Sequence, residues 1–195
     1  GEALFYKGIS AYQFSDTKKA NKYFEMSVAK DSISANAYFY KGLTEYDLEK
    51  YDEAIVSFDK AINIDDSLPD YYSLKGQVYL AKNNVDSAII CLKKAIQFPD
   101  CDEYSYAYLA SAFQTIESND SAVFYYDCAL KISDPKDNIY AICSYNKGLI
   151  YLLMKEYQQS IDVFKKHLDL FPDDYFAIVK YIQVIIEKGE SEEHL

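Results

Sequence analysis

The chain repeats one pattern at a constant interval, and this period constrains its fold more than any other feature. Tyr-Lys-Gly occurs at residues 6–8 and again at 40–42, and Leu-Lys-Gly follows at 74–76. One further step of the same length reaches Ala110, which is also small, and Gly148 then comes four positions later than the next step would place it. Three copies at one interval indicate a protein built from repeated structural units rather than a chance similarity.

Each repeat also places small and large residues at fixed distances from its glycine. Twelve residues after the glycine comes a small residue, four residues later a bulky one, and three residues later another position that is usually small. These three positions hold, in order along the chain, Ala20, Ala54, Ala88, Ala122 and Ser160; Phe24, Phe58, Leu92, Tyr126 and Phe164; and Ser27, Ala61, Ala95, Ala129 and His167. Because spacings of three and four residues lie on one face of a helix, each repeat is predicted to contain two helices joined by a short polar turn.

The recurring glycine predicts a close contact between helices. Inside a helix, glycine costs about 1 kcal/mol relative to alanine, so its return at one position needs a physical reason. We expect that the backbone of a neighbouring helix passes there too closely for a side chain to fit.

These positions resemble the tetratricopeptide repeat, or TPR, a motif of about 34 residues with the order aromatic, Leu-Gly, aromatic, then Ala, Phe and Pro. The fourth repeat shows the match with Tyr106, Leu109-Ala110, Phe113, Ala122, Tyr126 and Ala129. The resemblance implies an all-α fold, an α-α superhelix in which antiparallel helix pairs form a right-handed solenoid. Two departures stand out. Lys replaces Leu before the glycine in four repeats, and His167 replaces a small residue, so we expect the last full repeat to pack less tightly.

The repeats predict a single array over residues 1–188, with repeats at 1–34, 35–68, 69–102, 103–136 and 141–174 and a terminal helix at 175–188. Residues 189–195 are expected to form a frayed tail. The four residues 137–140 interrupt the period. They either extend the first helix of the fifth repeat by about one turn of roughly 3.6 residues or lengthen the loop before it, and we favour the extra turn.

The terminal helix is predicted to be apolar nearly all round, with Val184, Ile185 and Ile186 adjacent. A helix that ends a repeat array normally shows a polar outer face. We therefore expect that the sequence is a piece of a longer protein with further repeats, or that this helix associates with another chain.

Composition excludes several classes of function. The net charge is −11 and every basic residue is Lys, which argues against nucleic-acid binding. No apolar run reaches the roughly 18 residues of a membrane span. There is no Gly-rich phosphate loop and no Gly-x-Ser-x-Gly motif, so no catalytic residue and no cofactor is predicted.

The cysteines and histidines do not predict a metal site. Cys91, Cys101, Cys128 and Cys143 form no Cys-x-x-Cys pair, and the two histidines do not lie at metal-ligand spacing. Free thiols are the favoured interpretation, while a disulfide such as Cys91–Cys101 stays open. The compartment therefore also stays open between a bacterial periplasm or envelope and the cytoplasm.

The resemblance to TPR proteins implies a concave groove lined by the first helices, at positions three before, one after and four after each glycine. In this chain these positions hold Phe5, Ile9 and Tyr12; Phe39, Leu43 and Tyr46; Ser73, Gln77 and Leu80; Ala107, Ser111 and Gln114; and Tyr145, Leu149 and Leu152. The groove is predicted to be aromatic at its start, polar in its middle and apolar near its end. It carries no cation, so a partner's C-terminal carboxylate would lie there unpaired at a cost of several kcal/mol.

The leading hypothesis is therefore a non-enzymatic scaffold or adaptor that binds a protein or peptide with apolar anchors through this groove. An alternative for the aromatic residues is that they simply pack against a neighbouring helix or against a further repeat upstream of this sequence. A different class of function also stays open, in which the chain is a structural segment of a larger bacterial signalling or envelope protein and self-associates through its C-terminal helix.

Overall fold

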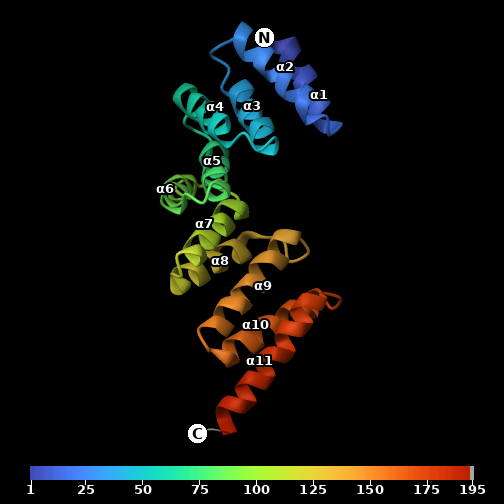
Figure 1. Cartoon of the computed structure of the whole chain (residues 1–195), viewed down its shortest axis with the longest axis vertical. Helices are drawn as coiled ribbons and strands as arrows, with labels where there is room; N and C mark the ends of the chain where they lie inside the picture. The colour runs from blue at the N-terminus through green and yellow to red at the C-terminus, as the bar shows by residue number, and fades with distance from the viewer. Residues whose placement is uncertain (194–195) are drawn as a thin grey trace. The chain divides into compact units, whose positions relative to one another are not determined.

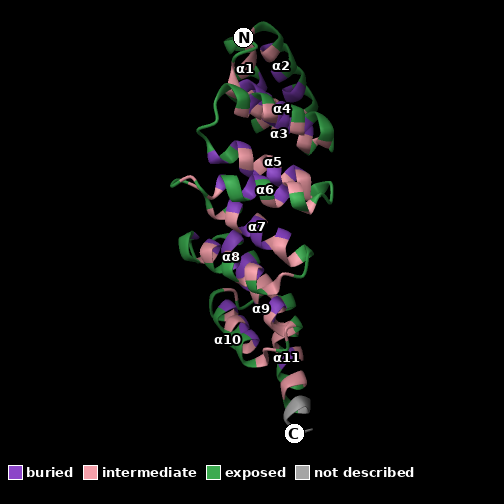
Figure 2. Ribbon diagram, turned by 90° about the vertical axis from the view of Figure 1, so that its left-hand side faces the viewer, coloured by how far each residue is buried: buried purple, intermediate pink, exposed green. Residues whose placement is uncertain are grey.

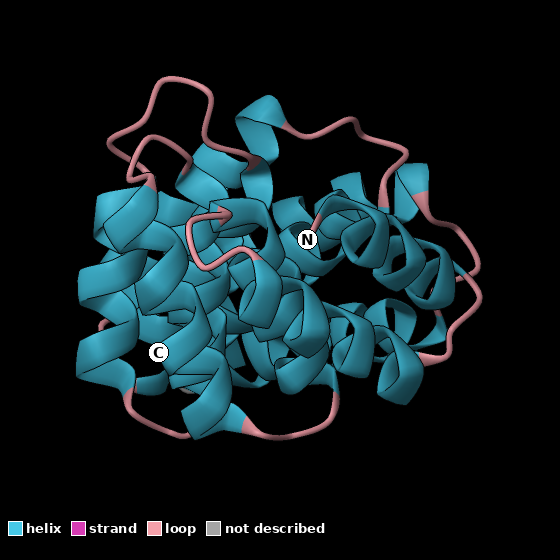
Figure 3. Cartoon of the chain, turned by 90° about the horizontal axis from the view of Figure 1, so that it is seen from above, coloured by secondary structure: helices cyan, strands magenta, loops and turns pink. Residues whose placement is uncertain are grey.

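The computed structural model describes the backbone of residues 1–193 and the surroundings of the side chains up to residue 189. Within this part the chain forms eleven α-helices and no strand (Figures 1 and 3). Their bounds are α1 Glu2–Gln13, α2 Thr17–Lys30, α3 Ala35–Asp47, α4 Tyr51–Ile64, α5 Pro69–Ala81, α6 Val85–Ala95, α7 Glu103–Thr115, α8 Asn119–Ile132, α9 Asn138–Leu153, α10 Tyr157–Leu170 and α11 Tyr175–Glu193. None of these helices is long and apolar enough to cross a membrane.

The helices group into two compact bodies. The N-terminal body, Gly1–Cys101, holds α1 to α6, and the C-terminal body, Asp102–Leu195, holds the remaining helices. Within each body consecutive helices pack as pairs, and the second helix of one pair contacts the first helix of the next. Buried residues lie between the paired helices, and exposed residues lie on their outer sides and in the loops (Figure 2). Each body is therefore a stack of helix pairs, as the repeats predict.

The turn inside each pair follows one backbone pattern. Seven residues after each glycine or Ala110, one residue adopts a left-handed conformation with φ between 56° and 61°. These residues are Ser15, Glu49, Asn83, Glu117 and Lys155. The next residue donates its N–H back into the preceding helix; for example, the N–H of Lys50 donates to the carbonyl of Glu45 over 2.8 Å. This left-handed ending of a helix usually carries glycine, so four of the five turns hold a residue that is not favoured there.

The recurring glycines face side chains, which corrects our expectation of a neighbouring backbone. A Cβ atom added to Gly8 would lie 2.5 Å from a ring carbon of Phe24, and one added to Gly76 would lie 2.6 Å from Cγ of Leu92. Only at Gly76 is a backbone atom among the nearest neighbours, the carbonyl oxygen of Ala88 at 3.4 Å. The glycine therefore makes room for the bulky residue sixteen positions later, which packs against the first helix of its own pair.

The lysines that replace Leu before the glycine also have a structural reason. Lys75 Nζ pairs with Asp59 over 2.5 Å, and Lys147 Nζ pairs with Asp127 over 2.5 Å. Each aspartate follows directly after the bulky core residue on the second helix of the preceding pair. The lysine therefore bridges consecutive pairs, a contribution of up to about 1 kcal/mol for a pair near the surface. Lys41 differs, because it binds Glu45 on its own helix.

The last full pair buries His167 where the other pairs have a small residue, and our expectation that this pair packs less tightly stays a prediction. In the pair α3/α4, Tyr38 on the first helix lies in one core cluster with Ala61 on the second. In α9/α10 the sizes at the same two positions of the repeat are reversed: the first helix carries Ser144, and the second carries His167. His167 is only 1% exposed, and its Nδ1 lies 2.7 Å from Ser144 Oγ. The α9/α10 pair therefore still places a small residue opposite a large one, but the small residue is on the first helix and the large one on the second.

Three further expectations concern single segments. Helix α9 begins ten residues before Gly148, whereas α3 and α5 begin seven residues before their glycines, so the favoured extra turn is confirmed. Helix α11 continues past Lys188 to Glu193, so residues 189–193 of the expected tail are helical, while 194–195 lie outside the described residues. All four cysteines are free, so the disulfide between Cys91 and Cys101 does not form.

Candidate functional site

The predicted groove residues lie on the first helices of the pairs, and nearly all of them are half-buried. In the N-terminal body they belong to α1, α3 and α5, and in the C-terminal body to α7 and α9. Ser73 is an exception, since it is buried in α5, where a partner cannot reach it. Ala107, at the matching position of α7, is also buried.

The aromatic residues three positions before the glycine take part in the core of their own pair. Ring centroids lie 5.8 Å apart for Phe5 and Phe24, and 5.9 Å apart for Tyr145 and Phe164. Phe39 makes the same contact with Phe58 of the second helix α4, and their ring centroids lie 5.9 Å apart. These rings cover the bulky residue that fills the space beside the glycine. The alternative interpretation, packing against neighbouring helices, therefore applies to part of their surface.

The residues one and four positions after the glycine link neighbouring first helices in the N-terminal body. Tyr12 donates its hydroxyl hydrogen to Asp47 Oδ2 over 2.9 Å, which ties α1 to the end of α3. Burial, together with this carboxylate, raises the pKa of Tyr12 to about 12. Ile9 packs into the same cluster as Phe24, and Tyr46 packs against the core around Phe58. Ile9, Tyr12 and Tyr46 each keep part of their surface accessible to solvent.

The polar positions in the middle of the predicted groove are engaged within the protein. Gln114 accepts a hydrogen bond from the Tyr126 hydroxyl over 3.0 Å, which joins α7 to α8. Gln77 is half-buried and has interactions within the protein, as does Ser73. Leu80 and Ser111 are half-buried at the remaining positions. Gln114 therefore helps to hold α7 against α8 rather than forming a free polar surface.

The C-terminal body holds an apolar pocket beside Tyr145, of about 390 Å³, which we call the α9/α11 pocket. It is lined by Ala141, Ile142 and Tyr145 of α9, by Phe176 of α11 and by Asp174. Ile142 is 53% exposed and Phe176 is 73% exposed, so large apolar surface faces solvent here. Leu149 and Leu152, further along α9, pack against the core of α10 and α11.

Sequence reasoning missed Ile142 and Phe176, although a signal was present. Ile142 lies six residues before Gly148, and Phe176 occupies the same position one period later. The first three repeats carry Glu2, Asn36 and Asp70 at this position and the fourth carries Tyr104, so the position changes from polar to aromatic or aliphatic from the fourth repeat onwards.

A Ser–His–Asp cluster joins the last three helices. Besides its contact with Ser144, His167 places Nε2 3.0 Å from Asp174 Oδ2, and Asp174 Oδ1 accepts a hydrogen bond from the N–H of Ala177 over 3.1 Å at the start of α11. Burial acts to raise the pKa of the Asp174 carboxyl, but the hydrogen bonds from Ala177 and His167 outweigh it and leave that pKa below its ordinary value.

The hydrogen bonds of this cluster join α9, α10 and the start of α11. Ser144 is 5% exposed, and its hydroxyl also lies 2.8 Å from the carbonyl oxygen of Tyr140 in the preceding turn. Ser144 and His167 also lie in the wall of a pocket between α8, α9 and α10. Among the described residues there is also no group of three or more side chains that could hold a metal ion.

Comparison with known families identifies the repeats. Residues 35–83 match a family model described as TPR repeat, and residues 69–98 and 143–174 match a model described as tetratricopeptide repeat. No curated protein matches the chain in sequence.

Solved structures resemble the chain closely in fold. The C-terminal part of a TPR repeat-containing protein from Cytophaga hutchinsonii has a TM-score of 0.82 at 19% identity, over 96% of this chain and 72% of that one. MamA from Desulfovibrio magneticus RS-1 has a TM-score of 0.79 at 16% identity, over 89% and 96%. YrrB, described as a TPR protein with an unusual peptide-binding site, has a TM-score of 0.73 at 20% identity, over 90% and 88%.

At these identities the solved structures establish the fold alone. The family assignment combines that fold with the matched repeats and with the period of the sequence. The chain therefore belongs to the tetratricopeptide repeat proteins, whose members are in general non-enzymatic scaffolds for protein interaction.

Proposed function

We propose that the chain is an adaptor that binds a segment of a partner protein through the first-helix faces, with apolar side chains as anchors. The α9/α11 pocket carries this proposal. Ile142 and Phe176 expose large apolar surface around a hollow of about 390 Å³, and such surface on a protein typically marks an interaction site. The peptide-binding site named for YrrB supports a peptide as the class of ligand for this fold.

The pocket favours a partner segment that has one large apolar side chain and a basic side chain near it. Its lining is apolar except for Asp174, whose side chain is 28% exposed at the edge. The chain as a whole carries a net charge of −11, which steers basic partners towards it. In the N-terminal body, Ile9, Leu43 and Tyr46 are the proposed anchor contacts, because part of each side chain remains accessible.

A displayed peptide library selected on the purified chain tests this function. Peptides that bind are synthesised, and their affinities are measured for the wild type, Ile142→Ser and Phe176→Ser. Burying a large apolar side chain is worth about 1.5–3 kcal/mol, and each 1.4 kcal/mol is about tenfold in affinity, so we expect roughly ten- to hundredfold weaker binding.

Phe124→Ser is the matched control. Phe124 is 60% exposed on the second helix α8 of the same body, so its removal takes away a similar apolar surface outside the pocket. The proposal predicts unchanged affinity for this variant. Equal losses for all three variants, or no selected peptide with an apolar anchor, would refute it.

A second contact surface is proposed on α11. Ile182, Ile185 and Ile186 are 50%, 45% and 55% exposed, and Ile182 stands one period after Gly148, where earlier repeats are covered by a second helix. We propose that this face associates with a second copy of the chain. Sedimentation should show a dimer that Ile185→Glu converts to a monomer, and a wild-type monomer at high concentration would exclude it.

A further inference from the structure

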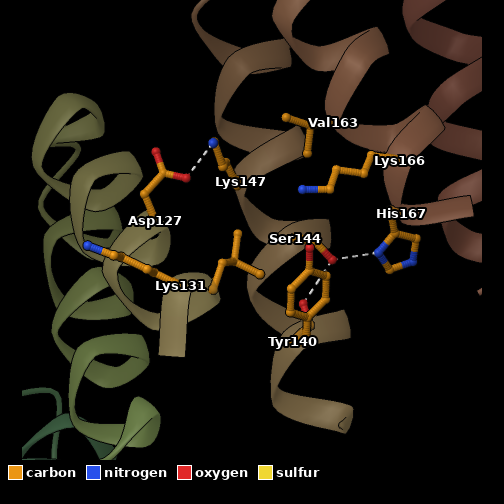
Figure 4. A pocket seen from close by; sticks show the side chains of 9 residues that line it. Asp127, Lys131, Tyr140, Ser144, Lys147, Val163, Lys166 and His167 are labelled. Carbon is orange, nitrogen blue, oxygen red and sulfur yellow. Dashed lines mark hydrogen bonds and ion pairs between the residues drawn. The ribbon is translucent and has the colours of Figure 1, made fainter. Parts of the chain in front are cut away.

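A second pocket, in the C-terminal body only, differs in chemistry from the α9/α11 pocket. It has a volume of about 220 Å³ and lies between α8, α9 and α10 (Figure 4). Its polar lining includes Asp127, Lys131, Tyr140, Lys147 and Lys166. This volume is more than ten times the roughly 10–15 Å³ that a single water needs, so a small molecule fits. We call it the lysine pocket.

The lysine pocket is cationic in a chain that is acidic overall. The chain has 31 acidic and 20 basic residues, yet three lysines and a single carboxylate, Asp127, line this pocket. Lys147 Nζ forms an ion pair with Asp127 Oδ1 over 2.5 Å. Within the described part of the chain, no carboxylate lies within ion-pair distance of Lys166 or of the exposed Lys131. An excess of two positive charges therefore faces this space.

Two hydrogen-bond donors remain available to a ligand. Figure 4 shows Lys166 and the ring of Tyr140 extending towards the middle of the pocket from α10 and α9. The Tyr140 hydroxyl makes no hydrogen bond within the described residues, and no side-chain polar atom there is both buried and unpartnered, so this hydroxyl is open to the pocket. His167 forms part of the wall, but Ser144 and Asp174 occupy both of its ring nitrogens.

We propose that the lysine pocket binds a phosphate monoester of a small organic molecule. A phosphate monoester carries close to two negative charges at neutral pH, which matches the excess of two positive charges. Lysine ammonium groups bind phosphate through charge-assisted hydrogen bonds, and the Tyr140 hydroxyl adds a neutral donor. Leu130 and Val163 form apolar walls, against which the organic group packs.

Titrations with three probes at constant ionic strength test the ligand class. Glycerol 3-phosphate should bind saturably, inorganic phosphate several-fold more weakly because it lacks the organic group, and acetate at least tenfold more weakly because it carries one charge. Amide chemical shifts should change on α8 to α10 around the pocket. Inorganic phosphate binding as tightly as glycerol 3-phosphate would overturn the monoester, and no saturable binding of either phosphate would overturn the site.

Variants test the donors. Lys166→Gln should weaken glycerol 3-phosphate binding at least tenfold, and Tyr140→Phe several-fold. Lys165→Gln is the matched control, because it removes the same charge from the neighbouring, exposed residue of α10, which does not line the pocket. It should leave the affinity unchanged. Equal weakening by Lys165→Gln and Lys166→Gln would show binding to general surface charge and would overturn the proposal. Circular dichroism confirms that each variant is folded.

Discussion

Restoring the usual size order of the pair Ser144 and His167 tests how the helix pairs are packed. In α3/α4, Tyr38 packs with Ala61, and in α9/α10 Ser144 faces His167 at the same two positions of the repeat. The variants are Ser144→Tyr, His167→Ala and the double variant, which rebuilds the order found in α3/α4.

The single changes should both be costly. His167→Ala removes a ring that is 1% exposed and leaves Ser144 and Asp174 without their partner, so we expect a loss of about 3 kcal/mol, at the lower end of the range for aromatic-to-alanine changes in cores. Ser144→Tyr forces a ring into the space that His167 fills, which costs about 1–3 kcal/mol for overpacking.

The double variant should be much less destabilised than the sum of the two single variants. The tyrosine ring refills the space left by histidine, and the remaining cost is the lost hydrogen bond to Asp174, about 1.5–3 kcal/mol for a bond to a charged group. The cycle therefore predicts a coupling free energy of about 2–3 kcal/mol in favour of the double variant. Urea unfolding followed by far-UV circular dichroism measures it. Additive losses would show that the two positions do not share one space and would refute the reasoning.

Three other predictions use the same unfolding assay. Gly8→Ala should destabilise by about 1–3 kcal/mol, because the added Cβ would lie 2.5 Å from the Phe24 ring, whereas Gly42→Ala should be nearly neutral, because its closest approach is 3.0 Å and alanine gains about 1 kcal/mol in helix propensity. Equal effects at the two sites would contradict this. Glu49→Gly should stabilise by up to about 1 kcal/mol by relieving a left-handed residue at φ 61°, and Asn83→Gly should gain less because asparagine tolerates this conformation. The pKa of Asp174 is lowered on folding, so its contribution to stability is complete above its ordinary pKa of 3.8 and is lost as the pH falls through the lower pKa of the folded state. Asp174→Asn should therefore flatten the stability profile below pH 3.8, and an unchanged profile would contradict the assignment.

The period and its small and large positions were sufficient to predict the helix pairs. The spacing of Gly42, Ala54 and Phe58 places these residues on the facing sides of two helices, and the structure has α3 and α4 there. The extra turn of α9 followed from the length of the insertion. What the glycine touches was predicted incorrectly, because the spacing shows that space is scarce but not whether a ring or a backbone fills it.

Contacts between pairs were harder to predict than contacts within them. The ion pair between Lys75 and Asp59 joins two positions that are sixteen residues apart. The pattern of a single repeat does not predict it, because the two residues belong to consecutive repeats. The inverted pair Ser144 and His167 is recognisable only when both positions are compared across the repeats, because the histidine alone does not show that the residue facing it is small. Exposure at Ile142 and Phe176 depends on how α9 and α11 pack, which a repeat pattern alone does not give.

Mapping a selected peptide onto the chain by NMR examines the proposed adaptor function. A peptide with an apolar anchor, labelled with a paramagnetic tag, should broaden the side-chain signals of Ile142, Tyr145 and Phe176 in the C-terminal body, and leave Phe124 on α8 unaffected. Broadening confined to the outer second helices, with the α9/α11 pocket unchanged, would contradict a partner site on the first-helix face.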